Sequence, residues 1–436
     1  MMICRMLRFA ALAAVLEATA LLSPAQAEFG KRFWLSQVDQ NAGDPEMAID
    51  AQGNAIFVWK KNPGSVDQFR VQARQASAGG ALGPILDLST NGKDALGFPK
   101  VAVDGSGNAI FAWIYSDGSV DRVQGRTLSN TGVLGPVLEL SNGGGDFDGP
   151  QVASDASGDV VFAWACADAG MRRAEARILA PDGTLGPLLY VSEVSYGNAF
   201  RPQLGIDDAG DAVLAWQVVG QTIRSRVISK TGQLGPVSRL AGQHTLGFEL
   251  AVNRDGHAVL VWERQRSDGY RIKARTFSTD GAKGPVLNIS SVSELAYDPF
   301  VAIDAGGGAV FTWRRRETQY RYQGRALSPS GVLGPVLDLS TDSPHRICQP
   351  RVTVDDDGNA LFAWAQAIDD QYYLVQTRSL SPDGTLGPVH DLSKPGNDSF
   401  CVRIAVTADG AHAAAVWQAR RSLQTTDFRI QGIMSR

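Results

Sequence analysis

Histidines, cysteines and a series of aspartates are the side chains of this chain that could take part in chemistry. The five histidines are widely spaced and form no His-Glu-x-x-His motif and no close Cys-His spacing of the kind that binds zinc. No Gly-x-Ser-x-Gly sequence marks a nucleophilic serine. Carboxylates from distant segments could still meet in the folded protein, but the absence of catalytic motifs favours a protein that is not an enzyme.

The aspartates recur in an Asp-x-x-Gly pattern that is typical of tight turns. An Asp side chain accepts hydrogen bonds from the turn amides, and the Gly takes a positive φ at no steric cost. The competing interpretation is calcium binding, but the spacing lacks the alternating acids and the terminal Glu of a calcium loop. We therefore expect no cofactor and a structural role for these aspartates, which are Asp50, Asp104, Asp155, Asp207, Asp304 and Asp355.

An arginine recurs downstream of these turns. Where Ile433 replaces the arginine, Thr407 also replaces the turn aspartate. Because a buried guanidinium without a partner is costly, this joint loss predicts that aspartate and arginine pair with each other. The alternative is that each arginine lies independently along the surface. The arginines are Arg74, Arg126, Arg177, Arg226, Arg275, Arg325 and Arg378.

Eight tryptophans recur at separations of 46 to 54 residues, and Gly-Pro dipeptides recur in the same phase. Each tryptophan follows a largely apolar run such as residues 109–112, which favours packing between structural units over an exposed sugar-binding surface. Two markers in one phase establish an internal repeat. The tryptophans are Trp59, Trp113, Trp164, Trp216, Trp262, Trp313, Trp364 and Trp417.

One repeat is most easily followed in residues 99–141. Short β-rich runs at 101–103, 108–113, 123–126 and 137–140 are separated by Gly-, Asp- and Asn-containing turns. Helical periodicity is not sustained anywhere in the chain. A four-stranded unit of this length, repeated eight times, predicts an all-β protein, an eight-bladed β-propeller of antiparallel blades.

The two ends of the repeat region are complementary. The last repeat stops after 428–432, its third strand, whereas residues 31–36 match the fourth strands of other repeats. We predict that this N-terminal strand completes the last blade, which closes the ring and covers two sheet edges. The predicted propeller domain is residues 28–436.

The connection between the fourth strand of one repeat and the first strand of the next varies most in sequence. In propellers such connections gather around the mouth of the channel, where ligands bind, although the same aromatic side chains could simply fill gaps between blades. The candidate ligand-binding residues are Phe98, Phe147, Tyr196, Phe200, His244, Phe248, Tyr297, His345, Arg346 and Phe400.

Residues 1–27 have the features of a signal peptide: two arginines, an apolar run and Ala25-Gln26-Ala27 before the cleavage point. This apolar run is too short to span a membrane, and no later stretch is long and apolar enough to do so. Without the leader, 39 basic side chains face 44 acidic ones, which does not favour nucleic acid or an anionic membrane as a partner. We expect a secreted or periplasmic monomer.

An oxidising compartment allows the remaining cysteines to pair. Cys348 and Cys401 occupy similar places in successive repeats, so an inter-blade disulfide is one interpretation, and three buried thiols including Cys166 are the other.

The phrase Pro-x-Val-Ala-Val-Asp-x-x-Gly-Asn-Ala-x-Phe-Ala-Trp, followed by Gln-Gly-Arg and Leu-Gly-Pro-Val-Leu-x-Leu-Ser, resembles repeats of secreted bacterial β-propeller proteins. The resemblance covers nearly all of residues 31–436 and implies a fold and an extracytoplasmic location. A fainter likeness to the Asp-box hairpins of sialidase-type propellers does not carry an active site across, because the tryptophan lies nine residues beyond the Asp instead of five.

Two functions follow as expectations. The first is a binding scaffold that recognises a glycan or a protein at the channel face. The alternative is a glycoside hydrolase or polysaccharide lyase at the channel mouth, with His244 and Glu249, or His345, Arg346 and Arg351, as the departures from the repeat that would supply its groups.

Overall fold

The computed structural model describes most of the chain after residue 27. The described residues are 28–38, 41–62, 69–89, 94–95, 98–143, 145–168, 170–292, 294–345, 348–368, 372–420 and 428–435. The predicted signal peptide and the candidate residue Arg346 lie outside them.

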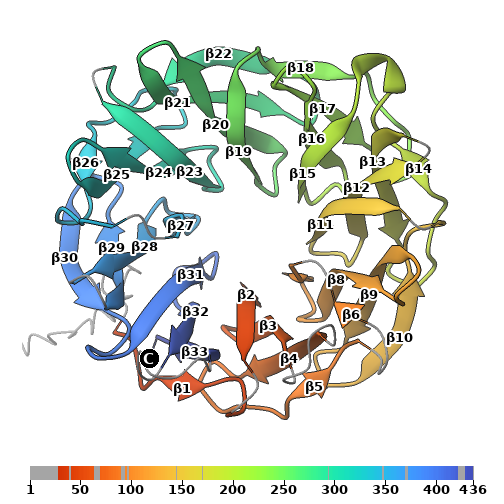
Figure 1. Cartoon of the computed structure of the whole chain (residues 1–436), viewed down its shortest axis with the longest axis horizontal. Helices are drawn as coiled ribbons and strands as arrows, with labels where there is room; N and C mark the ends of the chain where they lie inside the picture. The colour runs from red at the N-terminus through yellow and green to blue at the C-terminus, as the bar shows by residue number, and fades with distance from the viewer. Residues whose placement is uncertain are drawn as a thin grey trace, which may run out of the picture.

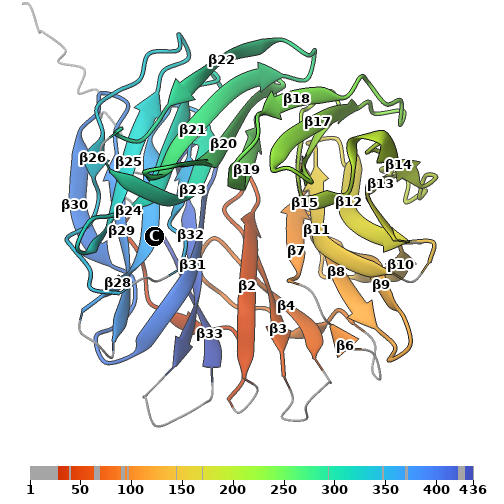
Figure 2. The same cartoon turned by 45° about the horizontal axis from the view of Figure 1, so that its top comes forward.

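Eight antiparallel sheets form a ring of blades around a central opening, which confirms the predicted eight-bladed β-propeller (Figures 1 and 2). Blade 1 is formed by β2 (Ala42–Ile49), β3 (Ala55–Lys61), β4 (Arg70–Ala76) and β5 (Leu86–Asp87), and blade 2 by β6 (Asp94–Ala95), β7 (Lys100–Val103), β8 (Ala109–Ser116), β9 (Asp121–Leu128) and β10 (Leu134–Glu139). Blade 3 is formed by β11 (Asp146–Ser154), β12 (Val160–Asp168), β13 (Met171–Leu179) and β14 (Leu189–Tyr190). Blade 4 is formed by β15 (Ala199–Ile206), β16 (Ala212–Val218), β17 (Thr222–Ile228) and β18 (Ser238–Ala241).

Blades 5 to 8 follow in the same order around the ring. Blade 5 is formed by β19 (Thr245–Val252), β20 (His257–Arg266), β21 (Gly269–Ser278) and β22 (Lys283–Asn288), and blade 6 by β23 (Leu295–Ile303), β24 (Ala309–Arg316), β25 (Tyr320–Leu327) and β26 (Leu337–Asp338). Blade 7 is formed by β27 (Arg351–Val354), β28 (Ala360–Ala367), β29 (Tyr373–Leu380) and β30 (Leu386–Asp391). Blade 8 is formed by β31 (Asp398–Val406), β32 (Ala413–Arg420), β33 (Phe428–Met434) and β1 (Phe33–Trp34). One short 3-10 helix, η2 (Val194–Tyr196), lies between β14 and β15.

The first strand of each blade lines the opening and the fourth lies at the rim (Figure 1). The first strands run from the face that carries the connections between blades, called the loop face here, to the face that carries the Asp-x-x-Gly turns, called the turn face. The second strand is apolar on both sides because it is covered by both neighbouring blades; in β8, seven of eight residues are buried. The core is therefore a set of hydrophobic clusters, one at each seam between blades.

The ring closes where the sequence predicts. Phe33 and Trp34 of β1 pair with Gly432 and Gln431 of β33, so the N-terminal strand becomes the fourth strand of blade 8. Leu35 is completely buried beside it. The Ser36 hydroxyl accepts a hydrogen bond from the Ile430 amide at 2.9 Å, as the Ser89 hydroxyl of blade 1 does from Val71 at 3.1 Å. The closing strand thus reproduces the contacts of an ordinary fourth strand.

The predicted pairing of turn aspartates with third-strand arginines is wrong. The Asp104 carboxylate accepts hydrogen bonds from the Ser106 and Asn108 amides of its own turn, both at 2.9 Å. Arg126 donates from Nε to the Gly135 carbonyl at 2.8 Å and from Nη1 to the Leu88 carbonyl of blade 1 at 3.0 Å. These carbonyls lie at a seam where they need donors, and the arginine supplies them.

Most of the repeated arginines make the same connection. Each donates to a glycine carbonyl of its own blade and to a carbonyl at the end of the preceding blade's fourth strand, as seen for Arg74, Arg126, Arg226, Arg275, Arg325 and Arg378. Arg177 bonds to the Asn142 side chain of blade 2 instead. The arginines are therefore staples between blades, and the turn aspartates are separate devices that hold each hairpin turn.

Blade 8 makes this connection with a different residue. In the other blades an arginine of the third strand lies opposite an apolar residue of the fourth, as Arg126 does opposite Val137. In blade 8 the two types are exchanged: Ile433 is in the third strand, and Arg32 in the closing segment donates to the Asp391, Leu392 and Ser393 carbonyls of blade 7. The arginine missing from the last repeat is thus supplied by the N-terminal end.

This exchange predicts the outcome of a double substitution. Arg32→Val and Ile433→Arg should each lower the free energy of unfolding by about 1–2 kcal/mol, the first by leaving carbonyls without a donor and the second by placing two guanidiniums at one seam. The double variant restores the Arg/Val arrangement of other blades, so it should recover at least half of the summed loss. Chemical unfolding of the four proteins measures the coupling, and strictly additive losses would contradict it.

Candidate functional site

The first strands share a bulge that shapes the channel wall. In six blades the register between first and second strand shifts at this point, for example between Gly43 and Glu46 in blade 1. Asp44, Arg201 and Asp298 adopt left-handed φ angles of 54°, 50° and 53° there. Positive φ is unfavourable for residues with a side chain, and bulges re-aim side chains beside binding sites.

One residue from each first strand, four places before its turn residue, forms a ring around the channel. Most members are polar in strands that are otherwise rich in apolar residues. In blade order they are Glu46, Lys100, Gln151, Gln203, Glu249, Phe300, Arg351 and Arg403.

A cavity of about 450 Å³ opens in the channel at this ring, and all eight blades contribute residues to its wall. Its polar lining comes from Glu46, Lys100, Asp148, Gln151, Arg201, Gln203, Glu249, Glu263, Asp298, Gln349 and Arg403. Its apolar lining includes Phe98, Pro150, Pro202, Phe248 and Pro299. A concave site with convergent polar groups and apolar faces is the usual form of a small-ligand site.

Glu46 is held between two cations on one side of the cavity. Lys100 Nζ and Arg403 Nε each lie 2.9 Å from one of its carboxylate oxygens. Burial alone would raise the pKa of Glu46, but the attraction of Arg403 and Lys100 is larger and holds it well below the usual range. Burial also opposes the charge of Arg403, and Glu46 raises the pKa of Arg403 in return. Glu46 is therefore ionised at neutral pH.

Glu249, in blade 5, has a different environment. Burial raises its pKa, although Arg351 and Lys100 favour its ionised form and Gln349 Nε2 lies 3.5 Å from it. Gln349 also accepts a hydrogen bond from Arg351 Nη1 at 2.8 Å, and Arg351 lies over the Phe300 ring at 4.3 Å. Burial lowers the pKa of Arg351 to about 10. Two carboxylates thus share the channel with pKa values shifted in opposite directions.

A disulfide fixes the segment that carries Gln349. Cys348 precedes β27 and bonds to Cys401 on β31, with a Cα separation of 5.2 Å, so it joins blades 7 and 8 beside the cavity. This is the inter-blade disulfide that the sequence left as one of two interpretations. Cys166 is buried in the cluster between blades 2 and 3.

Of the nine candidate ligand-binding residues that the structure describes, two line the cavity. Phe98 is 63% exposed at its mouth, whereas Phe248 is 5% exposed and also packs in the core cluster between blades 4 and 5. Their rings give the cavity apolar faces.

The other described candidates lie away from the cavity wall. Phe147 is buried between blades 2 and 3. Phe200, Tyr297 and Phe400 have aromatic or arginine neighbours: the Arg172 guanidinium at 5.4 Å, the Tyr270 ring at 5.0 Å and the Phe428 ring at 5.6 Å, respectively.

The remaining three candidates are on surface segments. Tyr196 lies on η2 under the Arg224 guanidinium, at 3.7 Å. His244 is exposed, and His345 is half-buried with its carbonyl accepting a hydrogen bond from the Ser343 hydroxyl at 3.2 Å. Neither histidine lines the cavity with Glu249.

The repeated residues lie in the frame that supports the site. All eight repeated tryptophans are buried at the seams. The turn aspartates direct their oxygens to turn amides; Asp355, for example, accepts from the Asn359 amide at 2.7 Å. Within the described part of the chain, no group of three or more His, Cys, Asp or Glu side chains is placed to hold a metal ion.

Sequence reasoning missed most of the polar residues of the channel ring, which are Glu46, Lys100, Gln151, Gln203 and Arg403, and it also missed Gln349 in the cavity wall. The signal that could have found all but Gln349 is the fixed offset from the turn residue, since a polar side chain at one repeated place in an inner strand faces the channel. Glu249 and Arg351 were anticipated only as departures from the repeat.

No protein-family profile and no curated protein matches this chain. Solved structures do match. The Hadza microbial sialidase Hz136 is 11% identical over 87% of this chain and 75% of its own, with a TM-score of 0.45, and the NanB sialidase from Streptococcus pneumoniae is 10% identical over 93% of this chain and 70% of its own, with a TM-score of 0.41. Prolyl oligopeptidase B from Galerina marginata is 10% identical over 89% of this chain and 57% of its own, with a TM-score of 0.49. The chain thus spans just over half the length of the prolyl oligopeptidase. At these identities and TM-scores the likeness carries no inference about activity.

Proposed function

We propose that this protein is a secreted or periplasmic glycan-binding scaffold whose ligand enters the channel from the loop face. The leader-like residues 1–27 support export. Among the described residues, no helix is long and apolar enough to cross a membrane. The propeller holds the loop face on eight mutually packed blades, a rigid support for recognition.

The observation that carries the proposal is the mixed lining of the 450 Å³ cavity. Sugar hydroxyls both donate and accept hydrogen bonds, so they suit a wall in which carboxylates, amides and cations alternate. Asp148, Gln203 and Glu263 supply acceptors, and Lys100 and Arg201 supply donors. Phe98 and the three prolines supply apolar faces against which a sugar ring can lie.

The test is a screen of the mature protein on a glycan array, followed by titration calorimetry with the best ligand. Gln203→Leu should weaken binding about tenfold, because a buried sugar hydroxyl loses its partner. Gln52→Leu, an exposed substitution on the turn face, is the matched control and should bind as the wild type does. An array without signal, or equal affinity in the Gln203→Leu variant, would contradict the proposal.

A glycosidase is the second candidate, favoured by the opposite pKa shifts of Glu249 and Glu46. A carboxyl with a raised pKa suits a general acid, and a carboxyl with a lowered pKa suits its ionised partner. Chromogenic glycosides test it: turnover that is lost in Glu249→Gln would replace the binding proposal with hydrolysis.

A further inference from the structure

One seam of the ring lacks the hydrophobic plug that the others have. At the start of the fourth strand, a leucine or phenylalanine packs against the preceding blade in seven of the eight repeats: Phe29, Leu82, Leu134, Leu185, Leu234, Leu333 and Leu386. In blade 5 this place is Lys283, which is opposite Phe277 in the ladder, as Leu134 is opposite Leu128 in blade 2.

The seam between blades 4 and 5 is correspondingly looser. Lys283 is exposed, and its Nζ reaches the Ser238 hydroxyl of blade 4 at 3.4 Å instead of filling the seam. Val286 is 45% exposed and Val389 of blade 7 is 42% exposed, whereas their counterparts in blades 1 to 4 and 6 are half-buried. Trp262 is 3% exposed, whereas the other seven repeated tryptophans are completely buried.

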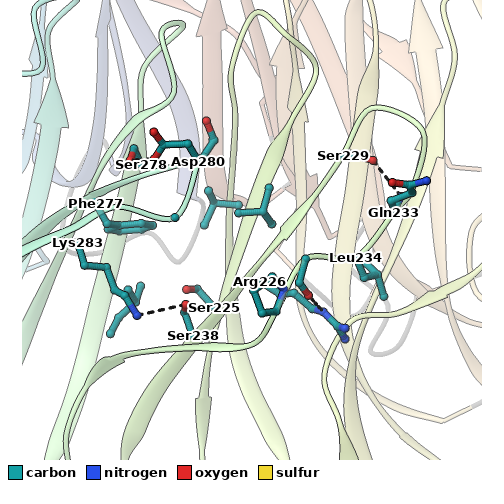
Figure 3. A pocket seen from close by; sticks show the side chains of 17 residues that line it. Ser225, Arg226, Ser229, Gln233, Leu234, Ser238, Phe277, Ser278, Asp280 and Lys283 are labelled. Atoms are coloured by element: carbon teal, nitrogen blue, oxygen red, sulfur yellow. Dashed lines mark hydrogen bonds between the residues drawn. The ribbon is translucent and has the colours of Figure 1, made fainter.

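A pocket of about 300 Å³ opens at this place, between β17 and β18 on one side and β21 and β22 on the other (Figure 3). Its walls include Val213, Leu234, Leu240 and Phe277, and hydroxyl groups such as that of Ser225 lie around them. The Phe277 ring faces the pocket beside Lys283 in Figure 3. A volume of this size accepts a small ligand with an apolar body.

Cations line a hollow next to the pocket. This second hollow, of about 340 Å³, shares Leu240 with the pocket and is lined by Arg239, Arg264 and Lys273. Burial lowers the pKa of Lys273, and the nearby Arg266 and Arg264 lower it further. The positive charges of these side chains and of Lys283 exceed the single negative charge of Asp280, which lines the first pocket. The charge is complementary to an anion.

We propose that the seam between blades 4 and 5 is a second ligand site, separate from the channel, that takes a small amphipathic carboxylate. The apolar body enters the pocket between Leu240 and Phe277, and the carboxylate lies against Lys283. The absence of the leucine plug creates the space, and the lysine that replaces it supplies the charge.

Two substitutions of one residue separate space from charge. Lys283→Leu restores the plug found in six other blades, so it should abolish binding of both decanoate and uncharged decanol. Lys283→Ala leaves the pocket open but removes the charge, so it should bind decanol as the wild type does and bind decanoate at least tenfold more weakly. Titration calorimetry on the full mature chain measures both ligands.

Further measurements complete the test. Lys283→Leu should also raise Tm by about 1–3 °C, because it fills a seam. Gln203→Leu, in the channel, should leave decanoate binding unchanged. The proposal is overturned if Lys283→Leu binds decanoate with wild-type affinity, if decylamine binds the wild type as tightly as decanoate, or if decanoate does not bind at millimolar concentration.

Discussion

Removal of residues 28–36 from a protein that begins at residue 28 is expected to abolish the cooperative unfolding transition. The segment supplies the whole fourth strand of blade 8, including the fully buried Leu35 and the Phe33 ring, which lies 6.1 Å from the Phe57 ring of blade 1. Its loss leaves the edge of β33 open and the seam between blades 7 and 8 without Arg32. An open strand edge also promotes self-association. Circular dichroism melts and size-exclusion chromatography would record lost cooperativity and aggregation.

Graded variants distinguish closure from a general effect of truncation. Leu35→Ala should cost about 2–5 kcal/mol, because it leaves a cavity in a fully buried position. A synthetic peptide of residues 28–37 added to the truncated protein should restore the melting transition, since it can pair with β33 as a fourth strand. A truncated protein that melts within a degree or two of the wild type would contradict the closing role.

The closure of the ring was predictable because the last repeat lacks a fourth strand and the N-terminal segment has the sequence of one. The missing strand after Gly432 and the extra strand before Ser36 can be matched without coordinates. The hydrogen bonds from the repeated arginines to the preceding blade were not predictable, because the carbonyls that Arg126 reaches there lie about 40 residues earlier in the chain. The sequence recorded that Ile433 and Thr407 change together, but that coincidence has no structural link. Arg32 explains why Ile433 can replace the arginine, but it does not explain the replacement of the turn aspartate by Thr407.

The candidate site shows a similar division. Variation among the connecting loops indicated the loop face, but of the described aromatic candidates only Phe98 and Phe248 line the cavity. The channel ring lies inside the repeat itself, at a place that a repeat alignment treats as part of the framework. Glu46 and Gln203 can be recognised as channel-lining residues once the first strand is known to be the innermost strand of its blade and to contain a bulge.

Glu46→Gln is expected to lower the free energy of unfolding by about 3 kcal/mol at pH 7. The substitution leaves Lys100 and Arg403 facing each other in the channel, with exposed side-chain fractions of only 31% and 24%. Removing one partner of a largely buried ion pair costs more than the pair itself contributes, because the remaining charges are uncompensated. Urea unfolding of both proteins measures the difference.

The pH dependence of that difference identifies its origin. The folded pKa of Glu46 is lowered, so its ionised form stabilises the fold fully above the unfolded carboxyl pKa of about 4.3, and this contribution is lost as the pH falls through the lower folded value. The gap between wild type and Glu46→Gln should therefore be constant from pH 6 to 8 and narrow below about pH 4. A gap that does not change with pH would point to packing, not charge.

Glu249→Gln is the matched control, since it makes the same change in the same ring on blade 5. Burial raises the folded pKa of Glu249, so ionisation of this carboxyl costs stability as the pH rises above its unfolded value. Replacing it by the amide should therefore be neutral or stabilising at pH 7, and its advantage over the wild type should shrink on acidification. The two variants change one carboxylate each, and only the surrounding cations and the degree of desolvation make their expected pH profiles opposite.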